Sequence, residues 1–336
     1  MTNQLVIPST MTAWVQDRYG DSSRFERRDV PVPELAADEV LVRVAATSLN
    51  AADRYMSDPA LVMRPMLGGL RGPKDPIGGL DVSGTVAALG SDVSSLAVGD
   101  RVFGEVGGGF GAFCAAKASR LAVVPDTVSL DDAAGVPIAG LTALQGLRNV
   151  AEVSDGAAVL VNGASGGVGT FAVQIARALG ATVTAVCSTK NVELARSLGS
   201  TDVVDYRSVD VIDHFTSAER RFDVIFDVAG VHSVRERSRL LMPDGICVFV
   251  GAPSGGRVAG PIPALLGSII AGRLARGRFS SFVAESNGDD MAVLAEMMAS
   301  GAVRTVVEDV MSIDEVPAAM TRFKQGHLAG KLILTH

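Results

Sequence analysis

A glycine-rich segment at residues 162–169 carries the clearest chemical pattern of the chain. It reads Asn-Gly-Ala-Ser-Gly-Gly-Val-Gly, after an apolar run and before an amphipathic one. Glycines at such a junction let the backbone turn sharply, and the free N–H groups that open the following helix bind the pyrophosphate of a dinucleotide. The segment therefore predicts a phosphate-binding turn between a strand and a helix, with Ala164 in place of the first glycine of G-x-G-x-x-G.

The same segment also matches a different motif. Residues 163–167 fit G-x-S-x-G around Ser165, the turn that exposes the nucleophile of serine hydrolases. His232 and His327 follow in the order that such an enzyme needs, but no HGGG-type motif precedes the serine, and the glycines continue to Gly169. The phosphate-binding turn is the favoured interpretation, and the hydrolase remains an alternative.

The next expected strand, residues 181–188, bears on which dinucleotide is bound. NAD-binding folds commonly place an acidic residue about 20 positions after the glycines, where it binds the ribose 2′-hydroxyl. Here the strand leads into Ser188, Thr189 and Lys190, two hydroxyls and a cation that suit a 2′-phosphate. We therefore expect NADP(H), with Tyr206 against the adenine. The alternatives are that the hydroxyls only cap a helix near Asn191 and that Tyr206 only packs.

The spacing of apolar runs predicts two structural units. From Trp14 to about Val128, short strand-like runs alternate with turn residues, whereas from about Asp131 continuous apolar strands alternate with helices. Continuous apolar strands are expected where both faces of a parallel sheet are covered. The chain is therefore expected to be α/β, with a Rossmann-type doubly wound parallel sheet in residues 131–284. A β-rich domain would comprise residues 1–130 together with 285–336.

Composition limits the partners. The chain has 336 residues, a net charge of −7 and a pI of about 5.2, so it offers no overall basic field to attract nucleic acid or an anionic membrane. Small-molecule partners are expected. Cys114, Cys187 and Cys247 form no CxxC pair, which suits a reducing cytoplasm. The longest apolar stretch, residues 258–272, is broken by prolines and is too short for a membrane helix.

Several segments together resemble the medium-chain dehydrogenase/reductase superfamily, and within it the zinc-independent quinone oxidoreductase-like branch. The resemblance covers nearly everything from Met11 onward and implies that the β-rich domain is a GroES-like catalytic domain. The segments that carry it are MTAWVQDRYG (11–20), SLNAADRYMSDP (48–59), PIGGLDVSGTVAALG (76–90), GDRVFG (99–104), AGVPIAGLTAL (134–144), NGASGGVGTFAVQIARALGA (162–181), FVGAPSG (249–255) and GKLILT (330–335).

The resemblance also implies the residues of a site between the two domains. Zinc-dependent relatives carry a cysteine in the loop that here reads 47–50 and a histidine where this chain has Leu80, so no metal is expected. Asn50, Asp53 and Tyr55 would line the substrate side, although Asn50 and Asp53 have purely structural alternatives. The residues implied to contact the cofactor are Thr142, Ser165, Gly166, Gly167, Val168, Val250, Gly251, Ala252 and Lys331.

The expected function is zinc-independent hydride transfer from NADPH to a quinone or an α,β-unsaturated carbonyl. Tyr55 or Asn50 would donate a hydrogen bond to the developing enolate, and solvent would supply the proton. A non-catalytic NADPH-binding sensor or structural protein is the alternative, because fold alone does not imply function. The resemblance further implies a homodimer, with the strand at 278–284 as the place for its interface.

Overall fold

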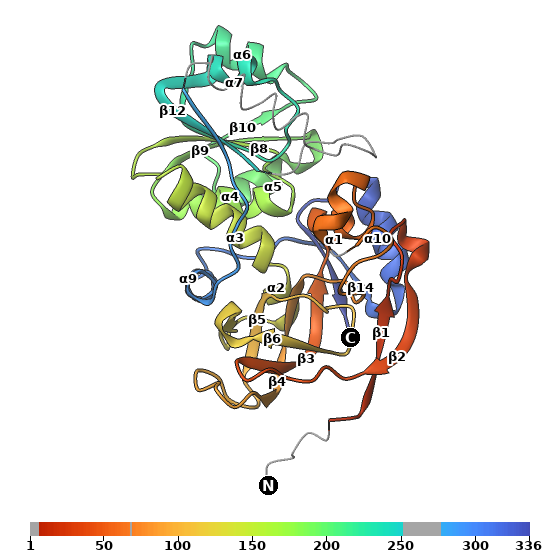
Figure 1. Cartoon of the computed structure of the whole chain (residues 1–336). Coiled ribbons are helices and arrows are strands. Elements are labelled where there is room, and N and C mark those ends of the chain that lie inside the picture. Colours follow the sequence, from red (N-terminus) through yellow and green to blue (C-terminus); the bar gives the residue numbers. More distant parts are fainter. Residues whose placement is uncertain (1–6, 68, 251–276) are drawn as a thin grey trace.

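The computed structural model describes residues 7–67, 69–250 and 277–336, and the structural statements below concern these residues. Two large sheets organise them, one in each lobe of the molecule (Figure 1). A separate pair of antiparallel strands, β1 (Thr10–Val15) and β2 (Glu26–Pro31), lies beside the second lobe. No helix within the described residues is long and apolar enough to cross a membrane.

The first sheet is parallel throughout its described strands, in the order β10-β9-β8-β11-β12-β13. This is the doubly wound order. Strands are added outward from β8 first on one side and then, from β11 onward, on the other, and ligands bind beyond the carboxyl ends of the strands at this switch point. The strands are β8 (Ala158–Asn162), β9 (Thr182–Cys187), β10 (Asp202–Asp205), β11 (Phe222–Asp227), β12 (Leu241–Phe249) and β13 (Arg278–Ser281).

Helices cover both faces of the parallel sheet. Figure 1 shows α3, α4 and α5 on the face toward the other lobe, and α6 and α7 on the opposite face. The strands read as apolar runs because both faces are covered, and their buried side chains form two core clusters. The helices are α3 (Pro137–Gln145), α4 (Gly167–Ala178), α5 (Val192–Ser197), α6 (Val211–Ser217) and α7 (Val234–Leu240).

The second sheet follows the order β14-β15-β3-β4-β5-β7, with β6 also paired to β3. Its described neighbours are antiparallel except β14 and β15. The C-terminal strands thus return to the sheet built by the N-terminal part of the chain. The strands are β3 (Glu39–Ser48), β4 (Asp81–Leu89), β5 (Arg101–Glu105), β6 (Phe113–Lys117), β7 (Leu121–Val123), β14 (Val307–Ser312) and β15 (Lys331–Thr335).

The expected fold class, a Rossmann-type parallel sheet plus a β-rich unit, is confirmed by these two sheets. The boundaries at 130/131 and 284/285 stay predictions. The short helix α2 (Leu130–Ala134) crosses the first of them and packs on β3 and β4 of the second sheet. The other helices are α1 (Ala51–Ser57), α9 (Gly288–Ala299) and α10 (Val316–Gln325).

Candidate functional site

The glycine-rich segment forms a tight turn between β8 and α4. Gly163 adopts φ +87°, a left-handed conformation, and the backbone N–H groups of Gly163 and Ala164 donate to the carbonyl of Val186 at 3.1 and 3.0 Å. Ala164 is fully buried in the main core and is not among the residues with positive φ. Its methyl group is therefore accommodated where the usual motif has glycine.

Two glycines of the turn serve different purposes. A Cβ on Gly169 would lie 2.1 Å from the carbonyl oxygen of Gly163, so only glycine lets α4 pack this close to the turn. A Cβ on Gly166, the N-cap of α4, would meet only that same oxygen, at an ordinary 3.6 Å. Packing within the protein thus does not require Gly166. The open backbone suits the close approach of a phosphate to the helix N-terminus.

Ser165 lies in this turn without the neighbours of a hydrolase nucleophile. Its Oγ accepts a hydrogen bond from Nδ2 of Asn191 at 2.8 Å, and neither His232 nor His327 is hydrogen-bonded to it. Ser165 is also not among the described non-glycine residues with positive φ, whereas a nucleophile elbow is strained. The geometry therefore favours the phosphate-binding turn over the serine hydrolase.

A buried polar cluster lies where several elements of the second sheet begin or end. The Oδ2 atom of Asp81, the first residue of β4, accepts hydrogen bonds from Ser48 Oγ at 2.7 Å and Asn50 Nδ2 at 2.8 Å. Lys331 Nζ, at the start of β15, lies 3.3 Å from the same oxygen and donates to Asn50 Oδ1 at 2.5 Å. Asp81 is fully buried and Lys331 is 2% exposed, so this ion pair is closed to water.

Asp81 also reaches the other lobe. Its second oxygen, Oδ1, accepts from the backbone N–H of Ile138 at 2.9 Å, in the first turn of α3, the helix that carries Thr142. One carboxylate thus ties together the end of β3, the start of β15 and the helix that packs against α4. The sequence motifs indicate Asn50 and Lys331 but not Asp81, because the contacts of Asp81 depend on how the strands pair.

Asn50 and Asp53 hold the N-terminus of α1. Asn50 is its N-cap, and the carboxylate of Asp53 accepts the backbone N–H groups of Asn50 at 2.8 Å and Leu80 at 3.0 Å. Burial, together with the nearby charge of Asp81, raises the pKa of Asp53 to about 7 despite these donors. Both polar ends of the Asn50 amide are occupied by Asp81 and Lys331. These contacts hold Asn50 and Asp53 in place, and the roles of both residues on the substrate side stay predictions.

Glu105, at the end of β5, is a further acid that the sequence did not reveal. It is the direct cross-strand partner of Asp81, and side chains of directly opposed residues lie on the same face of a sheet. Burial, followed by the Asp81 charge, raises the pKa of Glu105 to about 7. Three acids and one lysine therefore share this part of the sheet.

Tyr55 and Thr142 are two predicted contacts near this cluster that are partly exposed. Tyr55 lies on α1, with the guanidinium carbon of Arg54 5.5 Å from its ring centre. Thr142 lies on α3, and Val168 in the first turn of α4 is also half-buried. These side chains are accessible to a ligand, unlike those of Asp81 and Lys331.

The start of β15 joins the buried cluster directly to the glycine turn. The backbone N–H of Gly330 donates to the carbonyl of Ser165 at 2.8 Å, and Gly330 forms an isolated parallel bridge with Gly166. A Cβ on Gly167 would lie 3.1 Å from Cδ of Lys331, so the lysine stem runs beside the turn. The structure therefore brings Lys331 and the predicted phosphate contacts together.

The predicted 2′-phosphate residues lie at the carboxyl end of β9. Ser188 is buried, and Thr189 and Lys190 are exposed. The Oγ1 of Thr189 donates to Oδ2 of Asp205 at 2.6 Å, and Lys190 Nζ donates to the carbonyl of His327 at 3.1 Å. An acid, Asp205, therefore does lie among these residues. It comes from the end of β10 and not from β9.

Two predicted contacts lie further along the parallel sheet's carboxyl edge. Tyr206 is 47% exposed after β10, with the guanidinium of Arg207 5.9 Å from its ring centre. Val250 is buried after β12, and its N–H donates to the carbonyl of Asp227 at 2.9 Å. Gly251 and Ala252 lie outside the described residues.

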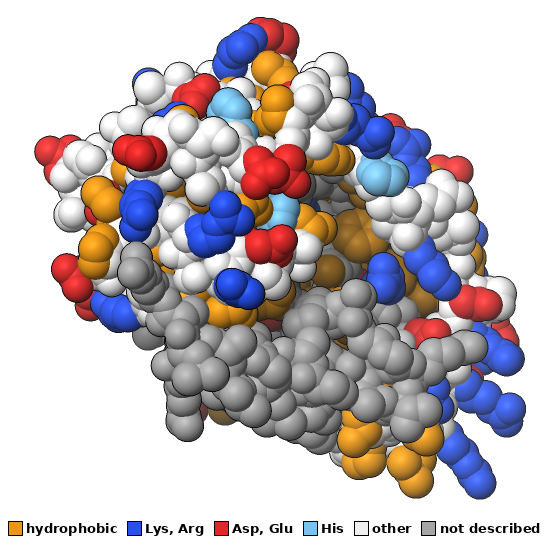
Figure 2. All heavy atoms as spheres, turned by 90° about the horizontal axis from the view of Figure 1, so that it is seen from above, with side chains coloured by type: hydrophobic (Ala, Val, Ile, Leu, Met, Phe, Trp, Pro, Cys, Tyr) orange, Lys and Arg blue, Asp and Glu red, His pale blue; other side chains and the backbone are white. Residues whose placement is uncertain are grey.

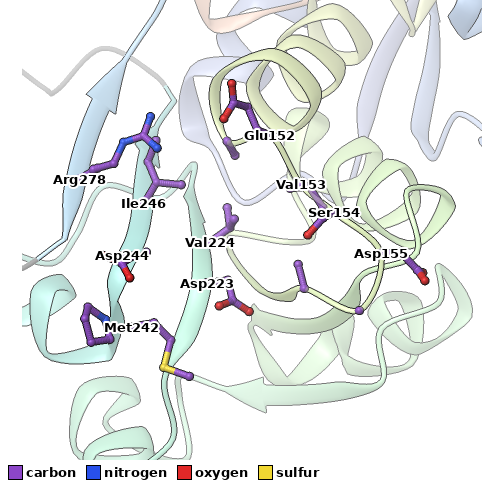
Figure 3. Close-up of a pocket in the computed structure, with 15 residues that line it drawn as sticks. Glu152, Val153, Ser154, Asp155, Asp223, Val224, Met242, Asp244, Ile246 and Arg278 are labelled. Atoms are coloured by element: carbon purple, nitrogen blue, oxygen red, sulfur yellow. The ribbon is translucent and has the colours of Figure 1, made fainter.

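A pocket of about 590 Å³ lies at the opposite edge of the parallel sheet. It is formed at the amino ends of β8, β11 and β12, and Figure 3 shows Glu152, Asp155, Asp223 and Asp244 around it with Arg278. None of the predicted site residues lines it. Because doubly wound sheets bind ligands at the carboxyl ends of their strands, the candidate site is the glycine-turn edge instead.

The surface seen from above carries charges of both signs. Acidic and basic side chains are interspersed over much of this face, with hydrophobic side chains between them (Figure 2). Among the described residues, no group of three or more His, Cys, Asp or Glu side chains is arranged to hold a metal ion.

Comparisons with known proteins agree with this architecture. Residues 36–172 match the family model described as "Alcohol dehydrogenase GroES-like domain", and residues 198–334 match "Zinc-binding dehydrogenase". The human "NAD(P)H oxidoreductase RTN4IP1, mitochondrial" is 32% identical, with 97% of this chain and 89% of the relative covered. The chain belongs to the medium-chain dehydrogenase/reductase superfamily.

Further relatives refine the position within that superfamily. The "2-methylene-furan-3-one reductase" of Solanum lycopersicum is 30% identical and covers 99% of this chain and 81% of its own length. The solved structure of the quinone oxidoreductase from Coxiella burnetii aligns with a TM-score of 0.84 and 27% identity, over 97% of this chain and 99% of that one. The chain thus lies in the quinone oxidoreductase-like branch, as its motifs predicted.

Proposed function

We propose that this member of the superfamily is an NADPH-dependent oxidoreductase that reduces a quinone or an α,β-unsaturated carbonyl without zinc. The observation that carries the proposal is the glycine turn, with Gly166 open at the N-terminus of α4 and Gly330 bonded to Ser165. The backbone N–H groups there suit a pyrophosphate. The hydrogen bond from Gly330 to Ser165 places β15 of the second sheet beside the turn. The names of the tomato and Coxiella relatives support the choice of acceptor.

The bound nicotinamide would supply the hydride, and the protein's own residues would bind and orient. Asp81, Asn50 and Lys331 hold β15 and α3 at fixed positions beside the turn. Asn50 is only 7% exposed, whereas Tyr55 is half-buried and accessible, so Tyr55 is the better donor to the acceptor's carbonyl oxygen, where negative charge develops. Solvent then supplies the proton, and the deeply buried acids take no direct part.

Zinc independence is proposed from the donor chemistry of the two positions that ligate zinc in zinc-dependent relatives. Leu80 has no ligand atom at one of them. In the loop at 47–50, Thr47 Oγ1 donates to the carbonyl of Asp81 at 2.6 Å, and Ser48 and Asn50 bond its carboxylate. Zinc prefers thiolate, imidazole and carboxylate ligands, which this loop does not offer. We expect a strong chelator to leave turnover unchanged.

We further propose a cytoplasmic homodimer. Among the described strands, β13 pairs with β12 alone, and pairing of its other edge with a second copy would continue the sheet across the dimer. Val283, just after it, is 90% exposed, which suits an interface. Sedimentation of wild type and a Phe279→Pro variant would test this edge. Cys114, Cys187 and Cys247 are buried free thiols, which suits a reducing compartment.

The test of the acceptor class is oxidation of NADPH with a panel of quinones and enones. A Tyr55→Phe variant should reduce enones about tenfold more slowly, because it loses one donor to the developing charge. Unchanged kinetics on every accepted substrate would remove the role of Tyr55. Tight NADPH binding without turnover would favour a sensor, and covalent labelling of Ser165 by a fluorophosphonate would favour the hydrolase.

A further inference from the structure

Asp205 ends β10 beside the end of β9, where the ribose of a dinucleotide would lie. Asp205 and Cys187 are register partners in this parallel pair, so the residues that follow Cys187 lie next to the carboxylate. Asp205 accepts hydrogen bonds from Thr189 Oγ1 at 2.6 Å, Arg207 N at 2.9 Å and Ser208 Oγ at 2.8 Å. These donors, that of Thr189 foremost, lower the pKa of Asp205, so the group is ionised at neutral pH.

The hydrogen bond between Thr189 and Asp205 affects the ribose of NADH and the 2′-phosphate of NADPH differently. A threonine hydroxyl has one proton to donate, and that of Thr189 already points to Asp205. A ribose 2′-hydroxyl can itself donate to the carboxylate, as acidic residues at this place do in NAD-binding folds. A 2′-phosphate can only accept, so it must take the Thr189 proton and leave two anions facing each other.

Two cations nearby offset part of that repulsion. Lys190 adjoins Thr189 and donates to the carbonyl of His327, while Arg207 follows Tyr206 in the loop that begins after Asp205. Both cations lie within two residues in sequence of Thr189 or Asp205. A 2′-phosphate would therefore meet two cations and one carboxylate, rather than the carboxylate-free loop that β9 alone indicates.

We propose that Asp205 is a specificity-determining residue, which weakens binding of the 2′-phosphate and lets the chain use NADH as well as NADPH. The proposal rests on the proposed function, since it concerns the ribose end of the same dinucleotide site. Selectivity is then set by the balance between Asp205 on β10 and the cations Lys190 and Arg207. It is not set by the end of β9 alone.

The test is calorimetric binding of two fragments, 2′,5′-ADP and 5′-AMP, which needs no turnover. Removing the charge with Asp205→Asn should tighten 2′,5′-ADP binding about tenfold, by the loss of one screened repulsion, and change 5′-AMP binding less than about twofold. Asp202→Asn is the matched control, because Asp202 begins the same strand and pairs with Arg220 away from the ribose end. It should change neither affinity.

The possible results distinguish an error in the role of Asp205 from an error in the proposed function. Equal shifts for both fragments, or no shift, in a folded Asp205→Asn protein would overturn the role of Asp205 while leaving the dinucleotide site intact. If Asp205→Asn fails to fold, Asp205→Ser serves in its place. It also removes the charge and should tighten 2′,5′-ADP more than 5′-AMP; an equal change for both fragments overturns the inference. Wild-type protein that binds neither fragment, NADPH nor NADH overturns the proposed function itself.

Discussion

Two polar regions flank the glycine turn, and they differ in how firmly their side chains are committed. In the cluster of Asn50, Asp81 and Lys331, the acid is fully buried and the lysine 2% exposed, and each polar group is bonded to another group of the protein. At the ribose end, Thr189 and Lys190 are exposed. The buried cluster therefore fixes the elements that carry it, whereas the side chains at the ribose end can leave their present hydrogen-bond partners to bind a ligand.

Burial explains this difference. A charge removed from water is costly unless it is paired and hydrogen-bonded, so losing one partner leaves the other stranded. An exposed charge is screened, and water replaces a lost partner at little cost. Substitutions in the buried cluster should therefore change stability, whereas substitutions at the ribose end should change binding.

The largest effect is expected for Lys331→Met, which strands the buried Asp81 carboxylate. We expect the free energy of unfolding to fall by about 3–5 kcal/mol, measured by urea denaturation. The control is Lys117→Met. Lys117 Nζ lies 3.0 Å from Oδ2 of Asp38, and both side chains are more than half exposed. That change should cost less than about 1 kcal/mol. Similar losses for both variants would show that burial does not distinguish the two regions.

Next in size is the contrast between two glycines of the turn. Gly169→Ala forces a Cβ to within 2.1 Å of the Gly163 oxygen and should destabilise the fold by about 1–3 kcal/mol. Gly166→Ala meets no such contact and should cost under about 1 kcal/mol. It should nevertheless weaken binding of NADPH, as calorimetry would reveal. Undiminished affinity in Gly166→Ala would mean that the phosphate does not approach this glycine.

A third effect, seen only as the pH changes, is carried by Glu105. Its folded-state pKa of about 7 lies above the ordinary value of 4.5, so the folded protein holds a proton that the unfolded chain has lost. The stability from this proton is fully present below about pH 4.5 and is lost as the pH rises through about 7. Glu105→Gln should flatten the fall in melting temperature over that window.

The control for this pH dependence is Glu193→Gln on the surface of α5, where Glu193 pairs with Arg196 and its side chain is 84% exposed. We expect its melting profile to follow that of wild type. A Glu105→Gln profile that also follows wild type would show that Glu105 is already ionised in the folded protein.

The smallest effect on stability is expected for Lys190→Ala at the ribose end. Because the side chain is exposed, the free energy of unfolding should change by less than about 0.5 kcal/mol. Binding of 2′,5′-ADP should nonetheless weaken about fivefold, because one phosphate-facing cation is lost. A stability loss as large as that of Lys331→Met would contradict the comparison.

Local patterns predicted much of this architecture. The glycine turn is predicted by the spacing of residues within one eight-residue segment, and the parallel strands are predicted by continuous apolar runs. The predicted strand ends differ from the observed ones by a few positions. The strand expected at 278–284, for example, forms only at Arg278–Ser281. The cap of α1 was also within reach, since Asn50 and Asp53 have the spacing of a capping box.

Contacts set by strand pairing were not predictable in this way. Asp205 reaches Thr189 only because β10 pairs with β9, and Glu105 faces Asp81 only because of the register of β5 on β4. The spacing of residues along the sequence indicates neither of these two contacts. The missing acid on β9 therefore predicted a carboxylate-free ribose loop, whereas the fold supplies a carboxylate from the neighbouring strand.

The most direct test of the central claim uses NADPH that carries deuterium at its transferable hydrogen. Purified wild-type protein is mixed with this NADPH and an accepted enone, and the product is analysed by mass spectrometry. The account predicts that the deuterium appears on carbon in the reduced enone as the nicotinamide is oxidised. Reduction without deuterium transfer, or no reduction of any enone or quinone, would contradict it.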